Sequence, residues 1–146
     1  MIKRANLSQK TMCPGPVDRL SVSHMCAVFN ERTVASLRAE QFVDTADFLE
    51  QMVKLWNFLN IKRTDAGKRL NDPNRAPVSR LDDPHINFLE TMATAFAGMR
   101  GGKGIGRDMS LTSETRSALV QSLHGLIHII RLSLNGRHSY VLPGNG

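Results

Sequence analysis

Two histidines four residues apart form a pair whose residue type and spacing could support metal binding. His124 and His128 stand in the run His-Gly-Leu-Ile-His. At this separation both imidazoles would lie on one face of a helix, at a distance suited to one metal ion. A zinc hydrolase of the H-E-x-x-H type also needs a glutamate as the base, and this run has none. We interpret the pair as solvated or hydrogen-bonded, and we keep a small metal-dependent hydrolase as an alternative.

A glycine-rich stretch from Gly98 to Gly106 invites comparison with phosphate-binding loops, since glycines let backbone N–H groups approach an anion. A Walker loop needs Ser or Thr after its lysine, whereas Lys103 is followed by Gly104. The dinucleotide-binding fingerprint fails because its third glycine and its βαβ context are missing. The sequence therefore predicts a flexible linker here.

The remaining reactive side chains form no recognisable catalytic set. Cys13 and Cys26 belong to no C-x-x-C pair and cannot make a disulfide framework. We expect Cys26 to be a small buried residue and Cys13 to be exposed in a turn. No nucleophile-elbow pattern is present, and the carboxylates fall on the expected outer faces of helices or at a helix start. The residues that we considered are Glu31, Glu40, Glu50, Glu90, Asp82 and Asp83.

Composition and periodicity predict the elements that must position these residues. The chain has 146 residues, 41% of them hydrophobic and only 5% aromatic, with seven methionines. This balance favours helices packed through aliphatic side chains over aromatic-rich strands. We expect an all-α fold: an N-terminal arm over residues 1–16, closed by a turn, and one domain of about four main helices over 17–146.

Apolar residues at steps of three and four predict four helices, and polar stretches separate them. The expected helices cover 18–39, 44–60, 83–98 and 113–135, with Trp56 as a core anchor and Asp44 or Thr45 capping the second. For the second helix the predicted buried stripe is Phe48, Leu49, Met52, Leu55, Trp56 and Leu59. Residues 61–82 are predicted to form a long irregular loop. Residues 138–143 are predicted to form an extended tail, and Gly144 to Gly146 are predicted to form no regular element.

A formal net charge of +6 weakly favours polyanionic partners, and its distribution is more informative. One group of cations falls in the 61–82 connection and a second falls in the glycine-rich stretch. The first comprises Lys62, Arg63, Lys68, Arg69, Arg75 and Arg80, and the second Arg100, Lys103 and Arg107. No apolar run approaches the roughly 20 residues that span a bilayer. The start lacks a secretory signal. We therefore expect an intracellular protein without membrane contact.

Three segments carry motifs that match one known family in order and spacing, over roughly residues 18–143. The run from Arg19 to Asn30, continuing as Val34-Ala-Ser-Leu37, resembles a Lys-Met-x-Val-x-Leu-Ala-x-Gln-x-Phe-Ser helix. The run from Thr45 to Asn60 looks like T-A-x-F-I-E followed by L-F-D-x-L-N-S-R. The run Ser110-Leu-Thr-Ser-Glu-Thr115 is similar to F-L-T-x-E-T, and Tyr140-Val-Leu142 to the following Y-V-L. These are motifs of the P-element-type, THAP-associated transposases, which the chain resembles.

The resemblance implies a helical GTP-binding insertion domain, which in that family interrupts an RNase H-like catalytic domain. GTP would serve as a cofactor for assembly on transposon DNA, with Mg²⁺ present only together with the nucleotide, and the protein would be nuclear. The family's catalytic carboxylates lie outside the matched region. The resemblance thus implies a fragment or domesticated remnant of a transposase that is not an enzyme alone and that works with GTP, transposon DNA and the rest of a transposase.

The residues that the resemblance assigns to the nucleotide are Asn57, Asn60 and Lys62. Asn60 matches the family, Lys62 would place a positive charge beside a phosphate, and Asn57 replaces the family's Asp. A carboxylate offers two acceptor oxygens to a guanine edge, so this replacement would weaken recognition of the base. A helical protein–protein adaptor remains a further alternative.

Overall fold

The computed structural model describes residues 7–13, 15, 21–99 and 111–145, and within these ranges the secondary structure is helical apart from one isolated β-bridge. The all-α prediction is therefore confirmed. The chain divides into two compact units, Met1–Leu59 and Asn60–Gly146. We describe each unit by itself.

The first unit begins with a short helix inside the predicted N-terminal arm. Helix α2 covers Gln9–Met12, and the Ser8 hydroxyl accepts a hydrogen bond from the Thr11 N–H at 3.1 Å. This side-chain cap satisfies one of the N–H groups that a helix start leaves without an intrahelical partner. Cys13 follows the helix and is exposed, as the sequence predicts, whereas Cys26 is only half-buried.

The predicted helix over 18–39 is wrong as one element, because the chain breaks at Asn30. Helix α3 covers Val22–Val28 and helix α4 covers Glu31–Ala39. The Asn30 side chain donates to the carbonyls of Cys26 and Ala27 at 3.2 and 2.7 Å and accepts from the Thr33 N–H at 3.0 Å. One amide therefore caps the end of α3 and the start of α4 together. The predicted start near residue 18 lies outside the described residues.

A tight turn connects α4 to α5. Helix α5 covers Val43–Leu59, so it begins before the predicted cap at Asp44 or Thr45. Gln41 has a φ of 66°, the Gln41 N–H bonds to the Arg38 carbonyl, and the Phe42 N–H bonds to the Leu37 carbonyl. This is a Schellman arrangement with glutamine where glycine is usual. The missing glycine explains why sequence reasoning misplaced the turn.

The core of the first unit lies between α4 and α5. Val34, Leu37, Ala46 and Leu49 form it, and Phe29 packs against them. The predicted stripe of α5 is partly wrong, since Phe48 and Leu59 are exposed, and Val53 and Phe58 are buried instead. Trp56 is half-buried. Buried positions 46, 49 and 53 follow helical steps of three and four, but on a face rotated from the predicted one.

The second unit starts with the 61–82 connection, which is more ordered than predicted. It contains helix α6 over Ala66–Arg69 and the 3-10 helix η2 over Pro73–Arg75. Val78 is fully buried and exchanges backbone hydrogen bonds of 3.1 and 2.8 Å with Val141 in an antiparallel bridge. The C-terminal tail is therefore paired with the connection, and it ends in the short helix η4 over Pro143–Asn145.

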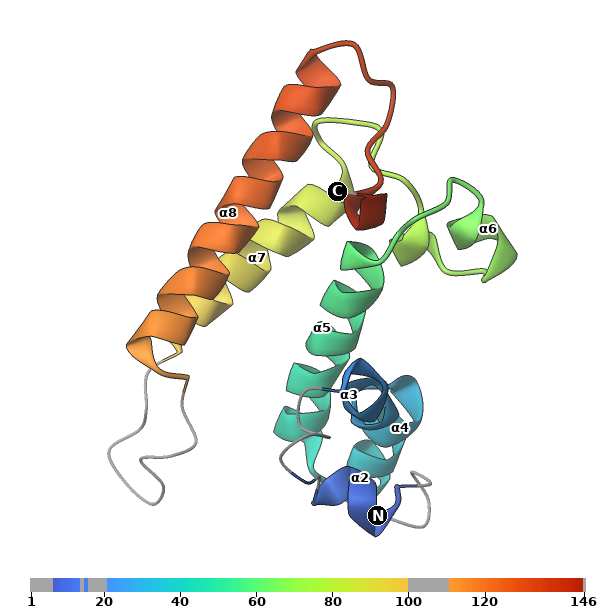
Figure 1. Cartoon of the computed structure of the whole chain (residues 1–146), viewed down its shortest axis with the longest axis vertical. Helices are drawn as coiled ribbons and strands as arrows, with labels where there is room; N and C mark the ends of the chain where they lie inside the picture. Colours follow the sequence, from blue (N-terminus) through green and yellow to red (C-terminus); the bar gives the residue numbers. More distant parts are fainter. Residues whose placement is uncertain (1–6, 14, 16–20, 100–110, 146) are drawn as a thin grey trace. The chain divides into compact units, whose positions relative to one another are not determined.

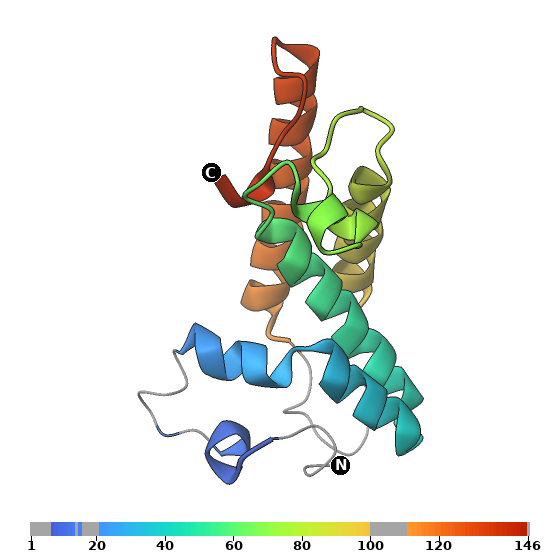
Figure 2. The ribbon, with the colours of Figure 1, turned by 90° about the vertical axis from the view of Figure 1, so that its right-hand side faces the viewer.

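Helices α7 over Pro84–Gly98 and α8 over Ser113–Asn135 form the core of the second unit. They lie side by side in Figure 1 and again in Figure 2. All five residues that the apolar spacing predicts for the inner face of α7 are buried, so this face is confirmed. For α8 only half of the predicted inner face is buried, because Leu119, Leu126 and Leu134 are half-buried. The buried residues are Ile86, Leu89, Met92, Ala93 and Phe96 of α7, with Leu123, Ile127 and Ile130 of α8.

The ends of these two helices agree with their sequence signals. The Asp83 carboxylate accepts from the His85 N–H at the start of α7, and the Thr112 hydroxyl accepts from the Thr115 N–H at the start of α8. Proline at position 84 is tolerated because the first helical N–H has no intrahelical partner. Gly136 follows the last residue of α8.

Candidate functional site

The three nucleotide-site candidates lie in one stretch of six residues, Asn57 to Lys62. Asn57 is half-buried in the last turn of α5 and belongs to the first unit. Asn60 and Lys62 are exposed at the start of the second unit, on either side of Ile61, which is 2% exposed. Burial of Ile61 fixes the backbone of this segment, and it leaves both neighbouring side chains facing solvent.

Gly144 in the C-terminal tail lies directly against the segment that holds Asn60 and Lys62. Its N–H donates to the Ile61 carbonyl at 3.0 Å. A Cβ at this position would stand 2.9 Å from the carbonyl carbon of Asn60 and from the oxygen of Ile61. A side chain therefore cannot fit without a backbone shift. The sequence pattern assigns this glycine no role, and its position after Pro143 is the signal that could have indicated one.

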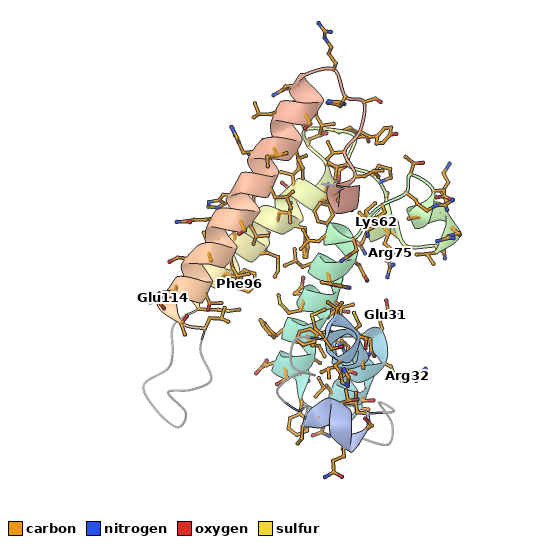
Figure 3. All side chains as sticks on the ribbon, in the orientation of Figure 1. Glu31, Arg32, Lys62, Arg75, Phe96 and Glu114 are labelled. Atoms are coloured by element: carbon orange, nitrogen blue, oxygen red, sulfur yellow. The ribbon has the colours of Figure 1, made fainter. Side chains whose placement is uncertain are left out.

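The basic connection is less positive than its cations suggest, because three of its arginines pair with nearby aspartates. The Arg63 guanidinium donates to both Asp65 oxygens, at 2.9 and 3.1 Å, and Arg80 makes the same two-pronged contact with Asp82. Arg75 Nε donates to Asp72 at 3.2 Å. Bidentate arginine–carboxylate pairs of this kind hold the guanidinium plane in one orientation. Figure 3 labels Lys62 and Arg75 on this part of the chain.

These pairs change the titration of their carboxylates. The hydrogen bond from Arg63 lowers the pKa of Asp65, and the hydrogen bond from Arg80 lowers the pKa of Asp82. The pKa values of both arginines are raised in turn. All four side chains are solvent-exposed, so the pairs orient the chain locally more than they stabilise it.

Two cations on α6 keep their charge available to a ligand. Lys68 and Arg69 lie in the last turn of this helix, are exposed, and form no ion pair with any described residue. Both side chains are therefore available to contact an anion. The second predicted basic group, Arg100, Lys103 and Arg107, lies outside the described residues, as does most of the glycine-rich stretch.

A buried aspartate, Asp83, links the 61–82 connection to the start of α7. Asp83 is 8% exposed, and its Oδ1 contacts His85 Nδ1 at 2.6 Å besides accepting from the His85 N–H. Its Oδ2 accepts from the Ser79 N–H at 3.4 Å. The other ring nitrogen of His85 lies 3.1 Å from the Asn74 carbonyl. The pair therefore ties the start of α7 to two points of the connection, which is a structural role.

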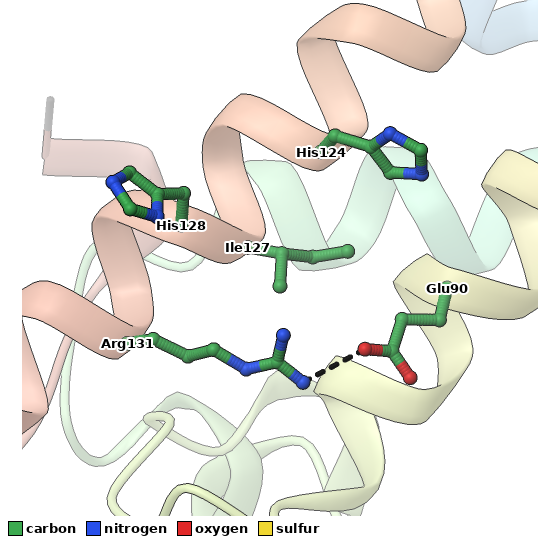
Figure 4. A pocket seen from close by; sticks show the side chains of 5 residues that line it. All are labelled: Glu90, His124, Ile127, His128 and Arg131. Atoms are coloured by element: carbon green, nitrogen blue, oxygen red, sulfur yellow. Dashed lines mark hydrogen bonds and ion pairs between the residues drawn. The ribbon is translucent and has the colours of Figure 1, made fainter.

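The two histidines of α8 line a shallow hollow of about 330 Å³ with Glu90, Ile127 and Arg131 (Figure 4). Arg131 donates to Glu90 at 2.7 Å across the two helices. His124 and His128 are both exposed, and their rings point away from each other in the close-up. Among residues 7–13, 15, 21–99 and 111–145, no group of three or more His, Cys, Asp or Glu side chains could hold a metal ion. This geometry gives the metal-hydrolase alternative no support.

No protein-family model, curated protein or solved structure matches the chain. In the described part of the chain, no helix has the length and apolar character needed to cross a membrane. We therefore infer function from the sequence resemblance and from the geometry of the chain itself.

Proposed function

We propose that this chain is the helical insertion domain of a P-element-type transposase, present as a fragment or a domesticated remnant, and that it binds GTP without catalysing a reaction alone. The observation that carries the proposal is the matching order and spacing of three helical segments and the tail motif. The all-α fold is compatible with it.

Contacts made by residues next to two of the resembling segments add support. The segment that ends at Asn60 and the tail that contains Tyr140-Val-Leu142 are about 80 residues apart in sequence. Gly144 nevertheless packs on Ile61, and Val141 pairs with Val78 of the adjoining connection. If the segment that ends at Asn60 and the tail motif contribute to one site, we expect them to lie close together in this way. The tail would then hold the Asn60–Lys62 backbone in place for a nucleotide.

In this proposal each nucleotide-site residue has a distinct task. Lys62 supplies positive charge to the phosphates, and Asn60 offers a side-chain amide that can donate and accept hydrogen bonds. Asn57 stands where the family has an aspartate, and its single carbonyl oxygen contacts a guanine edge less well than a carboxylate. Magnesium would enter only with the triphosphate, since the described residues offer no cluster of metal ligands.

Calorimetric titration of GTP into the purified chain with magnesium tests the proposal. We expect Lys62→Ala to weaken GTP binding at least about tenfold, a change of 1.4 kcal/mol. Lys68→Ala in the same connection serves as a matched control for loss of one exposed charge. Asn57→Asp should strengthen GTP over ATP by restoring two acceptor oxygens. No heat and no thermal shift at millimolar GTP would remove the nucleotide from the proposal.

Contact with transposon DNA is the second part of the proposal, and it involves Lys68 and Arg69. A contact with phosphates releases counterions, so the affinity must fall as salt rises. The double substitution Lys68→Ala and Arg69→Ala should reduce the salt dependence of binding to duplex DNA. Arg63→Ala and Arg80→Ala should have smaller effects because these guanidiniums are already paired with aspartates. Equal effects of the two sets would contradict the assignment.

A further inference from the structure

Helix α8 carries two large apolar side chains that its own unit leaves in solvent. Ile129 and Leu132 are each 58% exposed, the largest exposures among the described large hydrophobic residues. They lie about one third of a turn or more from the face of Leu123, Ile127 and Ile130 that packs on α7. Two such residues on neighbouring turns indicate an interaction surface rather than scattered surface apolarity.

Toward the start of the helix, the same face carries small side chains. Ala118, Ser122 and Gly125 are exposed and precede Ile129 and Leu132 at alternating steps of four and three. No described residue lies within 4 Å of a Cβ added to Gly125, so none of them requires a glycine there. Glycine inside a helix costs about 1 kcal/mol relative to alanine. Its absence of a side chain is useful where another helix approaches closely.

We propose that α8 pairs antiparallel with α8 of a second copy of this chain. Crossing at Gly125 places Leu132 of one copy over Ala118 of the other, and Ile129 over Ser122. Large side chains then fill the space left by small ones in both halves of the pair. The alternating spacing is that of a coiled-coil seam. Parallel pairing would instead align large with large and small with small, and it would leave a gap at the small half.

Charge complementarity also selects a second copy in this orientation. Glu114 in the first turn is the acidic residue of α8, and Arg137 lies two residues after its end. Antiparallel pairing about Gly125 brings Glu114 of each copy opposite the Gly136–Arg137 turn of the other, so opposite charges meet twice. Both residues are exposed. The antiparallel arrangement also sets opposite ends of the two helix dipoles side by side.

Sedimentation equilibrium of the full chain tests the association, with a monomer of 16.2 kDa. We expect a concentration-dependent dimer and at least a tenfold increase in its dissociation constant for Ile129→Glu or Leu132→Glu. Leu70→Glu, at another exposed leucine, should leave association unchanged. A monomer at all concentrations would overturn the proposal. It would also be overturned if Ile129→Glu lowered the melting temperature of a monomer, because the face would then be covered within the chain.

Disulfide trapping tests the orientation in a background with Cys13→Ser and Cys26→Ser. A mixture of Ala118→Cys and Leu132→Cys chains should form a mixed disulfide dimer, while Ala118→Cys alone should not. In the antiparallel pair the two copies of residue 118 are separated by 14 helical residues, roughly 20 Å. Dimerisation of Ala118→Cys with itself, without the mixed species, would identify a parallel pair and overturn the proposed arrangement.

Discussion

At the residue scale, Asp83 shows how one side chain can act at three places. It caps α7, contacts the ring of His85, and accepts a hydrogen bond from the Ser79 backbone. The neighbouring Asp82 is exposed and pairs only with Arg80. The sequence Asp82-Asp83-Pro84 marks a helix start, but it does not reveal which aspartate is buried, because that depends on how the connection folds back.

Replacing Asp83 by alanine should lower the free energy of unfolding by about 2 kcal/mol. The change removes a helix cap, and it leaves the backbone N–H groups of Ser79 and His85 without the Asp83 carboxylate as their hydrogen-bond acceptor. Urea denaturation followed by circular dichroism measures the effect. Asp82→Ala is the matched control and should change the free energy by less than about 0.5 kcal/mol. Equal losses for the two variants would contradict the distinct role of Asp83.

The Arg80–Asp82 pair should be visible as a shift in titration. Arg80→Ala removes the hydrogen bond that lowers the pKa of Asp82, so this pKa should rise toward its ordinary value of 3.8. A pKa that is lower in the folded chain contributes stability above the unfolded value and loses it as pH falls through the folded value. The contribution should therefore begin to fall near pH 3.8 and be lost once the pH passes the lowered pKa of Asp82. Carbon NMR of the carboxyl group checks the shift, and an unchanged pKa would argue against the pair.

At the element scale, the sequence predicts those helices whose ends carry side-chain signals. Asp83-Pro84 and Thr112 mark the starts of α7 and α8, and their apolar periods identify the inner faces. The break at Asn30 is not predicted because the apolar spacing continues through it. A polar residue inside such a pattern becomes a cap only when its amide finds partners on both sides.

The 61–82 connection and the tail illustrate what local patterns omit. Val78 and Val141 are 63 residues apart, and their bridge depends on the path of the chain between them. Pro73 and Pro77 indicate turns, but they do not show that the turns enclose a fully buried valine. Likewise, the three candidate nucleotide residues come from a family motif, and their spacing alone gives no information on the approach of Gly144.

Gly144→Ala should release the tail from the connection. Its methyl group would stand 2.9 Å from backbone atoms of Asn60 and Ile61, so the tail or the segment must move. We expect the amides of Val78 and Val141 to exchange with solvent at least about tenfold faster, which corresponds to 1.4 kcal/mol of local stability. Hydrogen exchange by NMR measures this. Gly98→Ala, where the added carbon meets nothing within 4 Å, should leave both amides protected.

At the scale of the whole molecule, each compact unit has a hydrophobic core of its own. The α4–α5 core contains Leu37, and the α7–α8 core contains Leu89, which is fully buried. Average composition predicts the helical class but not this division, because it carries no information on where along the chain the apolar residues gather.

Two matched core substitutions test whether the units unfold separately. Leu37→Ala and Leu89→Ala each remove a buried leucine, a change that costs about 2–5 kcal/mol in a packed core. If the cores are independent, Leu37→Ala should reduce amide protection in α4 and α5 while α7 and α8 keep theirs, and Leu89→Ala should do the reverse. Hydrogen exchange resolves the four helices in one experiment. Loss of protection in all four helices with either variant would mean that the chain unfolds as one cooperative unit.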